Sequence, residues 1–165
     1  MSHPTPTLHM LCGKIASGKS TLAAKLSEQP KTVLISEDEW LGVLFSSEIR
    51  TLQDYVKYAS KLKIVMGPHV SYLLMAGVSV VLDFPANTVE NRSWMRDLVK
   101  GTGAGHQLNV LQATDEICLA RLRGRNARGE HPFAATEEQF DRIGRHFVAP
   151  STEEDLNITT HRQSK

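Results

Sequence analysis

Short apolar runs alternate along the chain with longer stretches of helical periodicity. Apolar runs predict strands at residues 8–12, 32–36, 78–83 and 107–111, and a short fifth strand at 156–159. The run at 78–83 is almost continuously apolar, which is typical of a parallel strand buried on both faces. Helices are expected at residues 20–28, 36–45, 51–76, 88–100, 114–125 and 136–148. This alternation predicts an α/β domain with a parallel sheet covered on both faces.

Two local signals modify these elements. Ser36 and Glu39 have the spacing of a capping box, which predicts that the second helix starts there. Gly67 and Pro68 fall inside the long helical region at 51–76. Because proline lacks an N–H donor, we expect the helix to kink or restart at this pair.

Composition narrows the class of protein. The 165 residues suit a single domain spanning 1–165, with 41% apolar and 22% charged residues. Lys and Arg total 19 against 18 Asp and Glu, so the strongly basic surface of a duplex-DNA binder is absent. The sequence has no apolar run of the ~18 residues needed to span a membrane and no signal-peptide pattern at its start. Cys12 and Cys118 form neither a metal-type pair nor a disulfide framework, so we expect a soluble cytoplasmic protein.

A phosphate-binding loop is the strongest chemical signal. Residues 13–20 fit G-x-x-x-x-G-K-S/T without a mismatch, after a predicted strand and before a predicted helix. Glycines let the backbone N–H groups point at phosphate oxygens, and the helix start adds its positive dipole end. The alternative is a glycine-rich turn with no ligand. We expect nucleotide contacts from Gly13, Lys14, Ile15, Ala16, Ser17, Gly18, Lys19, Ser20 and Thr21.

The roles within this loop follow from its chemistry. Lys19 is expected to bridge the β- and γ-phosphates, and the Ser20 hydroxyl to hold Mg²⁺. Asp83 ends the third predicted strand and is the expected second ligand of Mg²⁺, although it could instead cap a helix. No glutamate follows Asp83 to orient an attacking water, and no guanine-binding motif occurs. These absences favour transfer of phosphate to a small acceptor over a motor ATPase.

From residue 8 to about residue 160, the chain resembles small P-loop kinases of the polynucleotide kinase, zeta-toxin and chloramphenicol phosphotransferase types. The resemblance implies a three-layer P-loop fold with a mostly parallel five-stranded sheet in the order 2-3-1-4-5, and ATP with Mg²⁺ as cofactors. In those families an aspartate after the second strand accepts the proton of the attacking hydroxyl, and Asp38 occupies that place. Polynucleotide kinases have an arginine three residues later, where this chain has Leu41.

Asp38 also qualifies on its position alone. A carboxylate that follows a strand's carboxyl end faces the crevice where open α/β sheets bind ligands. There it can take the proton of an acceptor hydroxyl, with Glu37 as the fallback base. The alternative is that Glu37, Asp38 and Glu39 only favour a helix N-terminus electrostatically.

Four arginines lie close together in the second half of the chain. Residues 121, 125 and 128 share one face of a helix, whereas residue 123 does not. In kinases of this shape, the corresponding segment (about 121–135 here) is a lid whose arginines neutralise the transferred phosphoryl group. Arg121 and Arg125 are the best candidates by resemblance. The alternative is a solvated basic face that pairs with Asp115, Glu116 or Glu130. Helix-breaking residues predict a hinged segment: Gly124, Gly129 and Pro132.

The leading hypothesis is therefore an ATP-dependent kinase that acts on a hydroxyl of a small molecule, such as a nucleoside, a sugar or an antibiotic-like compound. A 5′-hydroxyl polynucleotide kinase and a non-catalytic nucleotide-binding switch are the alternatives. A nucleic-acid partner is disfavoured by the near-neutral charge but left open. No membrane partner is expected.

Overall fold

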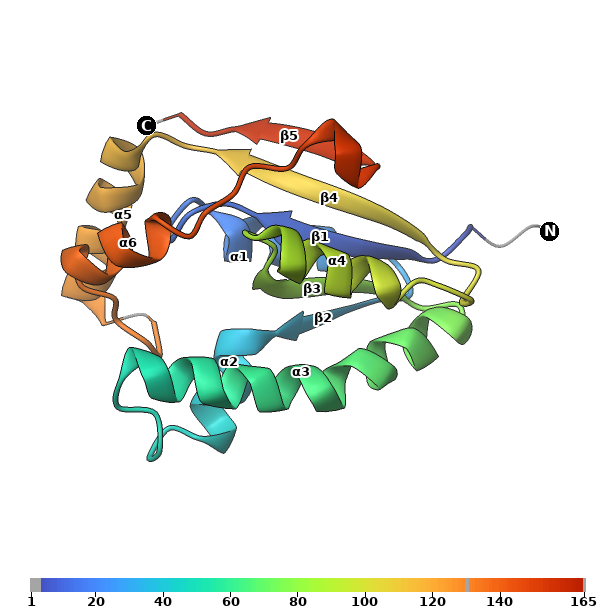
Figure 1. The fold of residues 1–165 in the computed structure, drawn as a ribbon, viewed down its shortest axis with the longest axis horizontal. Helices are drawn as coiled ribbons and strands as arrows, with labels where there is room; N and C mark the ends of the chain where they lie inside the picture. Colours follow the sequence, from blue (N-terminus) through green and yellow to red (C-terminus); the bar gives the residue numbers. More distant parts are fainter. Residues whose placement is uncertain (1–3, 130, 165) are drawn as a thin grey trace.

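Five parallel strands form the centre of the protein, of which the computed structural model describes residues 4–129 and 131–164 (Figure 1). The order β2-β3-β1-β4-β5 confirms the predicted fold class, and all four strand pairs are parallel. The strands are β1 (Thr7–Cys12), β2 (Thr32–Ser36), β3 (Ser79–Pro85), β4 (Gly105–Gln112) and β5 (Ile158–Arg162). The helices are α1 (Lys19–Ser27), α2 (Glu37–Leu44), α3 (Leu52–Met75), α4 (Val89–Asp97), α5 (Asp115–Arg128), α6 (Glu137–Gly144) and the 3₁₀ helix η1 (Thr152–Glu154).

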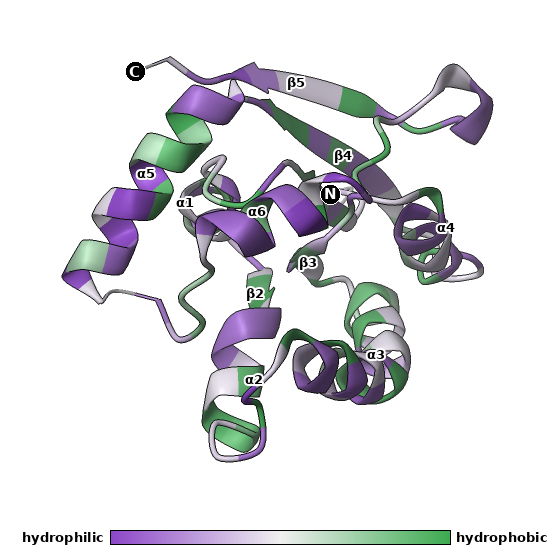
Figure 2. Ribbon diagram, turned by 60° about the vertical axis from the view of Figure 1, so that its left-hand side comes forward, coloured by the Kyte–Doolittle hydropathy of each residue, from purple (hydrophilic) through white to green (hydrophobic). Residues whose placement is uncertain are grey.

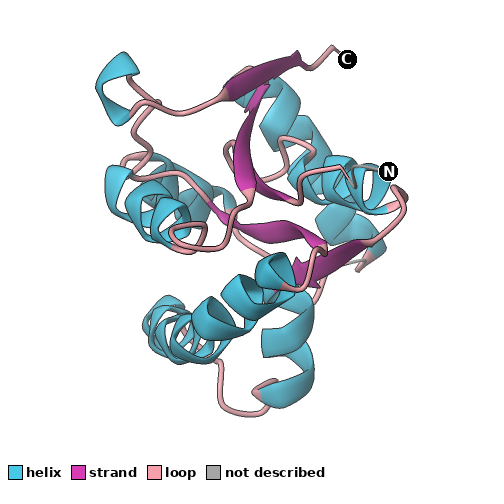
Figure 3. Cartoon of the chain, turned by 90° about the vertical axis from the view of Figure 1, so that its right-hand side faces the viewer, coloured by secondary structure: helices cyan, strands magenta, loops and turns pink. Residues whose placement is uncertain are grey.

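Helices cover both faces of this sheet, with α3 and α4 on one side and α1 on the other (Figures 2 and 3). Strand β1 shows the division clearly, because successive side chains of a strand point to opposite faces. Leu8 and Met10 are fully buried in the cluster that includes α3 and α4. Leu11 is also fully buried, but it packs with Ala23 of α1. Burial of each such side chain contributes about 1.5–3 kcal/mol to folding.

Helix α3 passes through Pro68 as one element of 24 residues, so the predicted restart is wrong. Proline frees the carbonyl of the residue four positions earlier, which is Ile64. Pro68 is exposed and Ile64 is 75% exposed, so water can solvate that carbonyl. On the opposite side, Met66 and Val70 are buried in the core and hold the helix against the sheet. Neither α3 nor any other helix within the described ranges is long and apolar enough to cross a membrane.

Two further boundaries differ from the expectation. Gly124 does not break α5, which continues to Arg128 and ends at Gly129 in the left-handed conformation (φ 63°). Glycine favours this conformation because it has no Cβ, so Gly129 is the actual stop signal. Strand β5 begins at Ile158 rather than at residue 156, because Ile158 pairs with Leu108 of β4.

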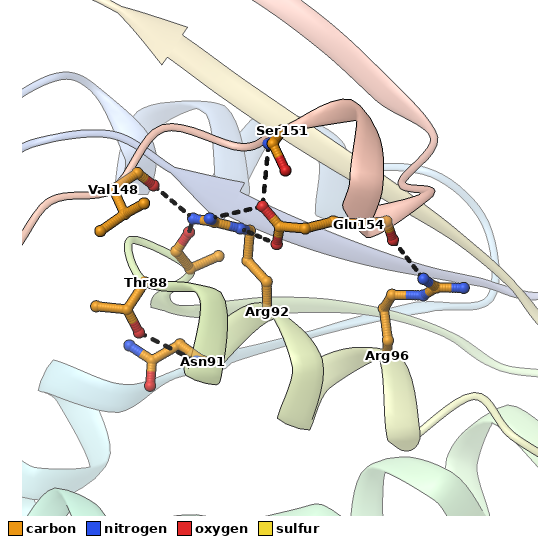
Figure 4. A network of polar contacts seen from close by, with 8 residues as sticks. Thr88, Asn91, Arg92, Arg96, Val148, Ser151 and Glu154 are labelled. Carbon is orange, nitrogen blue, oxygen red and sulfur yellow. Dashed lines mark hydrogen bonds and ion pairs between the residues drawn. The ribbon is translucent and has the colours of Figure 1, made fainter.

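A buried arginine fastens the segment after α6 to the body of the protein (Figure 4). Arg92 of α4 is fully buried and donates from Nε and Nη2 to the Glu154 carboxylate, at 2.8 and 2.9 Å. Its Nη1 donates to the backbone oxygens of Ala86 (3.0 Å) and Val148 (2.8 Å). Arg96, one turn later, donates to the Glu154 backbone oxygen. One guanidinium thus joins α4, the loop after β3 and the chain that leads to β5.

Candidate active site

The phosphate loop connects β1 to α1, and its two glycines are structurally required. A Cβ at Gly13 would lie 2.4 Å from Ser17 Oγ, which is closer than side-chain atoms approach. Gly18 has φ 103°, a left-handed conformation that other residues rarely adopt. The Ser17 N–H donates to the Lys14 carbonyl at 3.1 Å and closes a turn within the loop. The loop therefore has the tight curvature that the motif predicts.

Asn87, which the sequence analysis missed, fixes the start of this loop. Its Oδ1 accepts the Gly13 N–H at 2.8 Å, and its Nδ2 donates to the Gly13 carbonyl at 2.8 Å. The Val148 N–H donates to the Asn87 carbonyl at 2.9 Å, and Arg92 binds the carbonyl of the preceding residue, Ala86. The arginine network of Figure 4 thus supports the loop that positions Gly13.

Lys19 lies across the phosphate loop. Its Nζ donates to the Gly13 carbonyl at 2.6 Å and to the Lys14 carbonyl at 2.8 Å. Burial lowers the pKa of the Lys19 ammonium, and the Asp83 carboxylate acts in the opposite direction. The ammonium is held where a phosphate bound to the loop would meet it.

The two expected Mg²⁺ ligands are in contact although they are far apart in sequence. Ser20 Oγ donates to Asp83 Oδ2 at 2.9 Å. Burial raises the pKa of Asp83, while the Ser20 hydrogen bond and Lys19 act against this rise. Mg²⁺ prefers oxygen ligands and usually keeps several waters beside one or two protein groups and substrate phosphates. The pair fits an ion that arrives with a nucleotide, and no group of three or more His, Cys, Asp or Glu residues among those described could hold a metal alone.

Two neighbouring carboxyl groups begin α2 at the other end of the site. The Ser36 hydroxyl caps this helix, and Glu37 and Asp38 follow in its first turn. The Tyr55 hydroxyl lies 2.7 Å from Glu37 Oε1 and 2.6 Å from Asp38 Oδ1. His131 Nε2 lies 3.0 Å from Asp38 Oδ2. Sequence analysis assigned no role to either Tyr55 or His131.

The two carboxyl groups have opposite pKa shifts. Burial raises the pKa of Glu37 to about 7, and the hydrogen bond to Tyr55 offsets only part of this rise. Burial also disfavours ionisation of Asp38, but hydrogen bonds to His131 and Tyr55 outweigh it and the pKa of Asp38 falls below its usual value. At neutral pH, Asp38 is ionised, as a proton acceptor must be, whereas Glu37 with its pKa of about 7 is only partly ionised.

The arginines divide into two groups. Arg121 Nη1 donates to the Ser17 carbonyl at 3.3 Å, and Arg125 lines the same cleft with Arg128. The Nε of Arg125 is buried and has no hydrogen-bond partner among the described residues. Arg123 points elsewhere and pairs with Glu137 at 2.6 Å.

One of the predicted acidic partners of the arginines has a different partner. Asp115 pairs with Lys14 of the phosphate loop at 2.6 Å. Glu130 lies outside the described residues. Arg121 instead contacts the end of the chain, with Nη1 3.5 Å from Gln163 Oε1 and Nη2 3.2 Å from the Ser164 carbonyl.

One cleft of about 1050 Å³ is lined by Lys19, Ser20 and Asp83 and by both carboxyl groups at the start of α2. The phosphate loop, Asp83 and the two arginines line one part, and Asp38 lines it with Tyr55 and His131. Apolar side chains complete the wall: Ile49, Leu52, Pro132, Phe133 and Ile143. The sequence signals for the phosphate loop and for Asp38 therefore meet in one space, where a nucleotide and a second molecule can lie side by side.

Comparisons with known proteins agree with this architecture. Residues 8–150 match the family described as the AAA domain. A candidate kinase from Chloroflexus aurantiacus has a TM-score of 0.75 at 19% identity, over 98% of this chain and 87% of that one. Kti12 from Chaetomium thermophilum, bound to ADP-AlF3, has a TM-score of 0.70 at 14% identity, over 94% and 89%. The APS kinase CysC from Mycobacterium tuberculosis, bound to AMPPNP and APS, has a TM-score of 0.61 at 20% identity, over 98% and 91%. These likenesses show a shared fold, and no curated sequence matches the chain.

Proposed function

The chain belongs to the AAA domain family, and on this basis we propose that it binds ATP with Mg²⁺ and transfers the γ-phosphoryl group to a hydroxyl of a small molecule. The observation that carries the proposal is the shared cleft, in which a complete phosphate loop lies beside a carboxylate whose pKa is lowered. A nucleotide-binding protein without an acceptor has no need of such a base. Structures of the same fold hold ADP-AlF3 or AMPPNP, which supports ATP as the nucleotide.

Nucleotide binding rests on the loop and on the start of α1. The Gly13 and Ser17 N–H groups bond to Asn87 and Lys14, so the other backbone N–H groups of the loop would bind the β-phosphate, together with the positive end of α1. Lys19 would exchange its contacts with the loop carbonyls for the β- and γ-phosphates. Ser20 and Asp83 would hold the Mg²⁺ that enters with ATP.

Phosphoryl transfer then requires an acceptor held in position and a group that takes the proton of its hydroxyl. The acceptor oxygen attacks the γ-phosphorus, the bond to the β-phosphate oxygen breaks, and ADP leaves with that electron pair. The acceptor proton passes to Asp38, late in a loose transition state. Arg121 and Arg125 would neutralise charge on the transferred group.

A small acceptor is favoured over a polynucleotide end. The position that carries an arginine in polynucleotide kinases is Leu41, which is fully buried in the core. No phosphate of a nucleic acid can be bound there. The formal charge of +1 also does not indicate a basic surface for a long anionic chain.

Loss of the Lys19 ammonium tests nucleotide binding. We expect saturating MgATP to stabilise the wild type by about 3 kcal/mol at a hundred times Kd, and to stabilise Lys19→Ala much less. Thermal unfolding with and without MgATP measures the difference. Lys57→Ala, which removes an exposed lysine of α3, is the matched control and should keep full protection. Equal protection of wild type and Lys19→Ala would contradict the assignment of the loop.

An ATP-consumption screen across nucleosides, sugars and aminocyclitols tests the transfer itself. We expect one class to accelerate ATP turnover and to carry the phosphate afterwards. Protection by MgATP without transfer to any alcohol would instead favour the nucleotide-binding switch. Transfer to a 5′-hydroxyl oligonucleotide alone would favour the polynucleotide kinase.

Residues 121–135 form the proposed lid, and the structure describes all of them except residue 130. In this structure the segment contacts α2 through His131 and Asp38, and a Cβ at Gly42 would lie 3.2 Å from Pro132. Hydrogen exchange at residues 121–132 is therefore expected to slow when Mg²⁺ and a non-hydrolysable ATP analogue are added. Unchanged exchange there, with protection at residues 13–20, would mean that the arginines form only a solvated face.

A further inference from the structure

The Tyr55 hydroxyl lies between two carboxyl groups but has only one proton. Its oxygen is 2.7 Å from Glu37 Oε1 and 2.6 Å from Asp38 Oδ1. A phenolic hydroxyl donates one hydrogen bond, so it can satisfy only one of two ionised carboxylates. The second contact is a hydrogen bond only if a carboxyl group supplies the proton. The geometry therefore requires one of the two acids to be neutral.

Glu37 is the acid that carries this proton. Its residue is 3% exposed, and its Oε2 is buried with no hydrogen-bond partner among the described residues. An ionised oxygen without a partner in such a place is strongly disfavoured, whereas a neutral carbonyl oxygen is tolerated better. Burial raises the pKa of Glu37 to about 7. Asp38, by contrast, has a side chain that is 35% exposed, and His131 contacts its second oxygen.

We propose that Glu37 and Tyr55 are positioning residues for Asp38, joined to it by a directed chain of hydrogen bonds. The Glu37 carboxyl donates to the Tyr55 oxygen, and the Tyr55 hydroxyl donates to Asp38 Oδ1. This chain fixes Oδ1. Oδ2 already contacts His131 Nε2, and its second lone pair is the one that meets the acceptor hydroxyl. The role of Asp38 as base rests on the proposed function, whereas the hydrogen-bond chain itself does not.

The charges around the chain determine what happens when Glu37 ionises. The groups that act on Glu37 or Asp38 come from α3, β3, α1, α5 and the segment after α5: Lys63, Asp83, Lys19, Arg125 and His131. Ionised Asp38 and Asp83 both oppose a charge on Glu37, and Lys63 only partly offsets them. Once Glu37 ionises, two carboxylates compete for the single proton of Tyr55. The orientation of Asp38 is then lost, so the chain works only below the pKa of Glu37.

Carbon-13 NMR of the aspartate and glutamate carboxyl carbons, recorded against pH on the nucleotide-free protein, tests this chain. We expect one glutamate to titrate near pH 7 in the wild type and to disappear in Glu37→Gln. The Asp38 signal should sense that same transition in the wild type. It should not do so in Glu37→Gln, whose amide donates to Tyr55 at every pH. Glu39→Gln removes the exposed carboxylate of the residue after Asp38. The titrations of Glu37 and Asp38 should be unchanged in this variant.

Tyr55→Phe tests the second link. Without the hydroxyl, Asp38 loses a donor to its charged form and should titrate at higher pH than in the wild type. Tyr72→Phe, an exposed tyrosine of the same helix, should have no effect.

Two results would overturn the proposal: no glutamate of the wild type titrating near neutrality, or an unchanged Asp38 titration in folded Tyr55→Phe. The first needs no variant, so it holds even if Tyr55→Phe does not fold. Failure of MgATP to protect the protein would refute the proposed function alone, because these titrations use no nucleotide.

Discussion

Asp38→Asn is expected to lower the turnover of the acceptor by about 10²- to 10⁴-fold, or roughly 3–5 kcal/mol in activation free energy. The amide keeps the size of the carboxylate but cannot take the proton of the attacking hydroxyl. Binding of MgATP should stay nearly unchanged, because Lys19, Ser20 and Asp83 make no hydrogen bond to Asp38. Steady-state kinetics with the acceptor found by the screen, together with MgATP titration, measure the two effects separately.

Glu39→Gln is the matched control for this substitution. It removes a neighbouring negative charge from the same helix turn, but Glu39 is exposed, so turnover should remain near the wild-type rate. If Asp38→Asn kept a wild-type rate while Glu37→Gln did not, the base would be Glu37. The burial of Glu37, which is 3% exposed, argues against that outcome.

Arg92→Met is expected to lower the free energy of unfolding by about 3–5 kcal/mol, which is the usual cost of removing one partner from a buried ion pair. The substitution removes both guanidinium donors from the Glu154 carboxylate, which keeps only the Ser151 N–H, and removes the Arg92 donor from two backbone carbonyls. Urea unfolding followed by circular dichroism measures the loss. Arg96→Met removes only a donor to the Glu154 backbone and should cost about 1 kcal/mol.

The loss of unfolding free energy in Arg92→Met should also depend on pH in a defined direction. The hydrogen bonds from Arg92 hold the pKa of Glu154 below its ordinary value. A depressed carboxyl pKa stabilises the folded state above the unfolded pKa, and this contribution disappears as pH falls through the folded pKa. The difference between wild type and Arg92→Met should therefore shrink in acid. A constant difference, or a loss no larger than that of Arg96→Met, would contradict the network drawn in Figure 4.

The features predicted correctly from sequence are those that depend on short spacing or on strand topology. The phosphate-loop motif and the alternation of strands and helices were enough to place Ser20 beside Asp83, because Ser20 follows β1 and Asp83 lies near the carboxyl end of the neighbouring parallel strand β3. Of the two outcomes expected at Pro68, the restart does not occur, because α3 continues as one helix. Sequence alone does not show that Met66 and Val70, on either side of this proline, are buried in the core and hold the helix together.

The residues that were missed act through contacts between distant segments. The Asn87 side chain binds Gly13 from the loop that follows β3. The Tyr55 hydroxyl of α3 contacts two carboxyl groups at the start of α2. His131 reaches Asp38 from the far side of the cleft. None of these residues has a local spacing that marks its role. The only sequence feature that could have indicated such a role is a hydroxyl among apolar residues of a helix, as at Tyr55.

The contacts of Arg121 with Gln163 and Ser164 have a practical consequence for work with this protein. They hold the last described residues beside the Ser17 carbonyl, so any segment joined there leaves the molecule next to the nucleotide cleft. The first described residues lie at the opposite end of β1 (Figure 1). An affinity tag or a surface-immobilisation anchor therefore belongs on the N-terminal side, where it cannot obstruct entry of ligands or restrain the proposed lid.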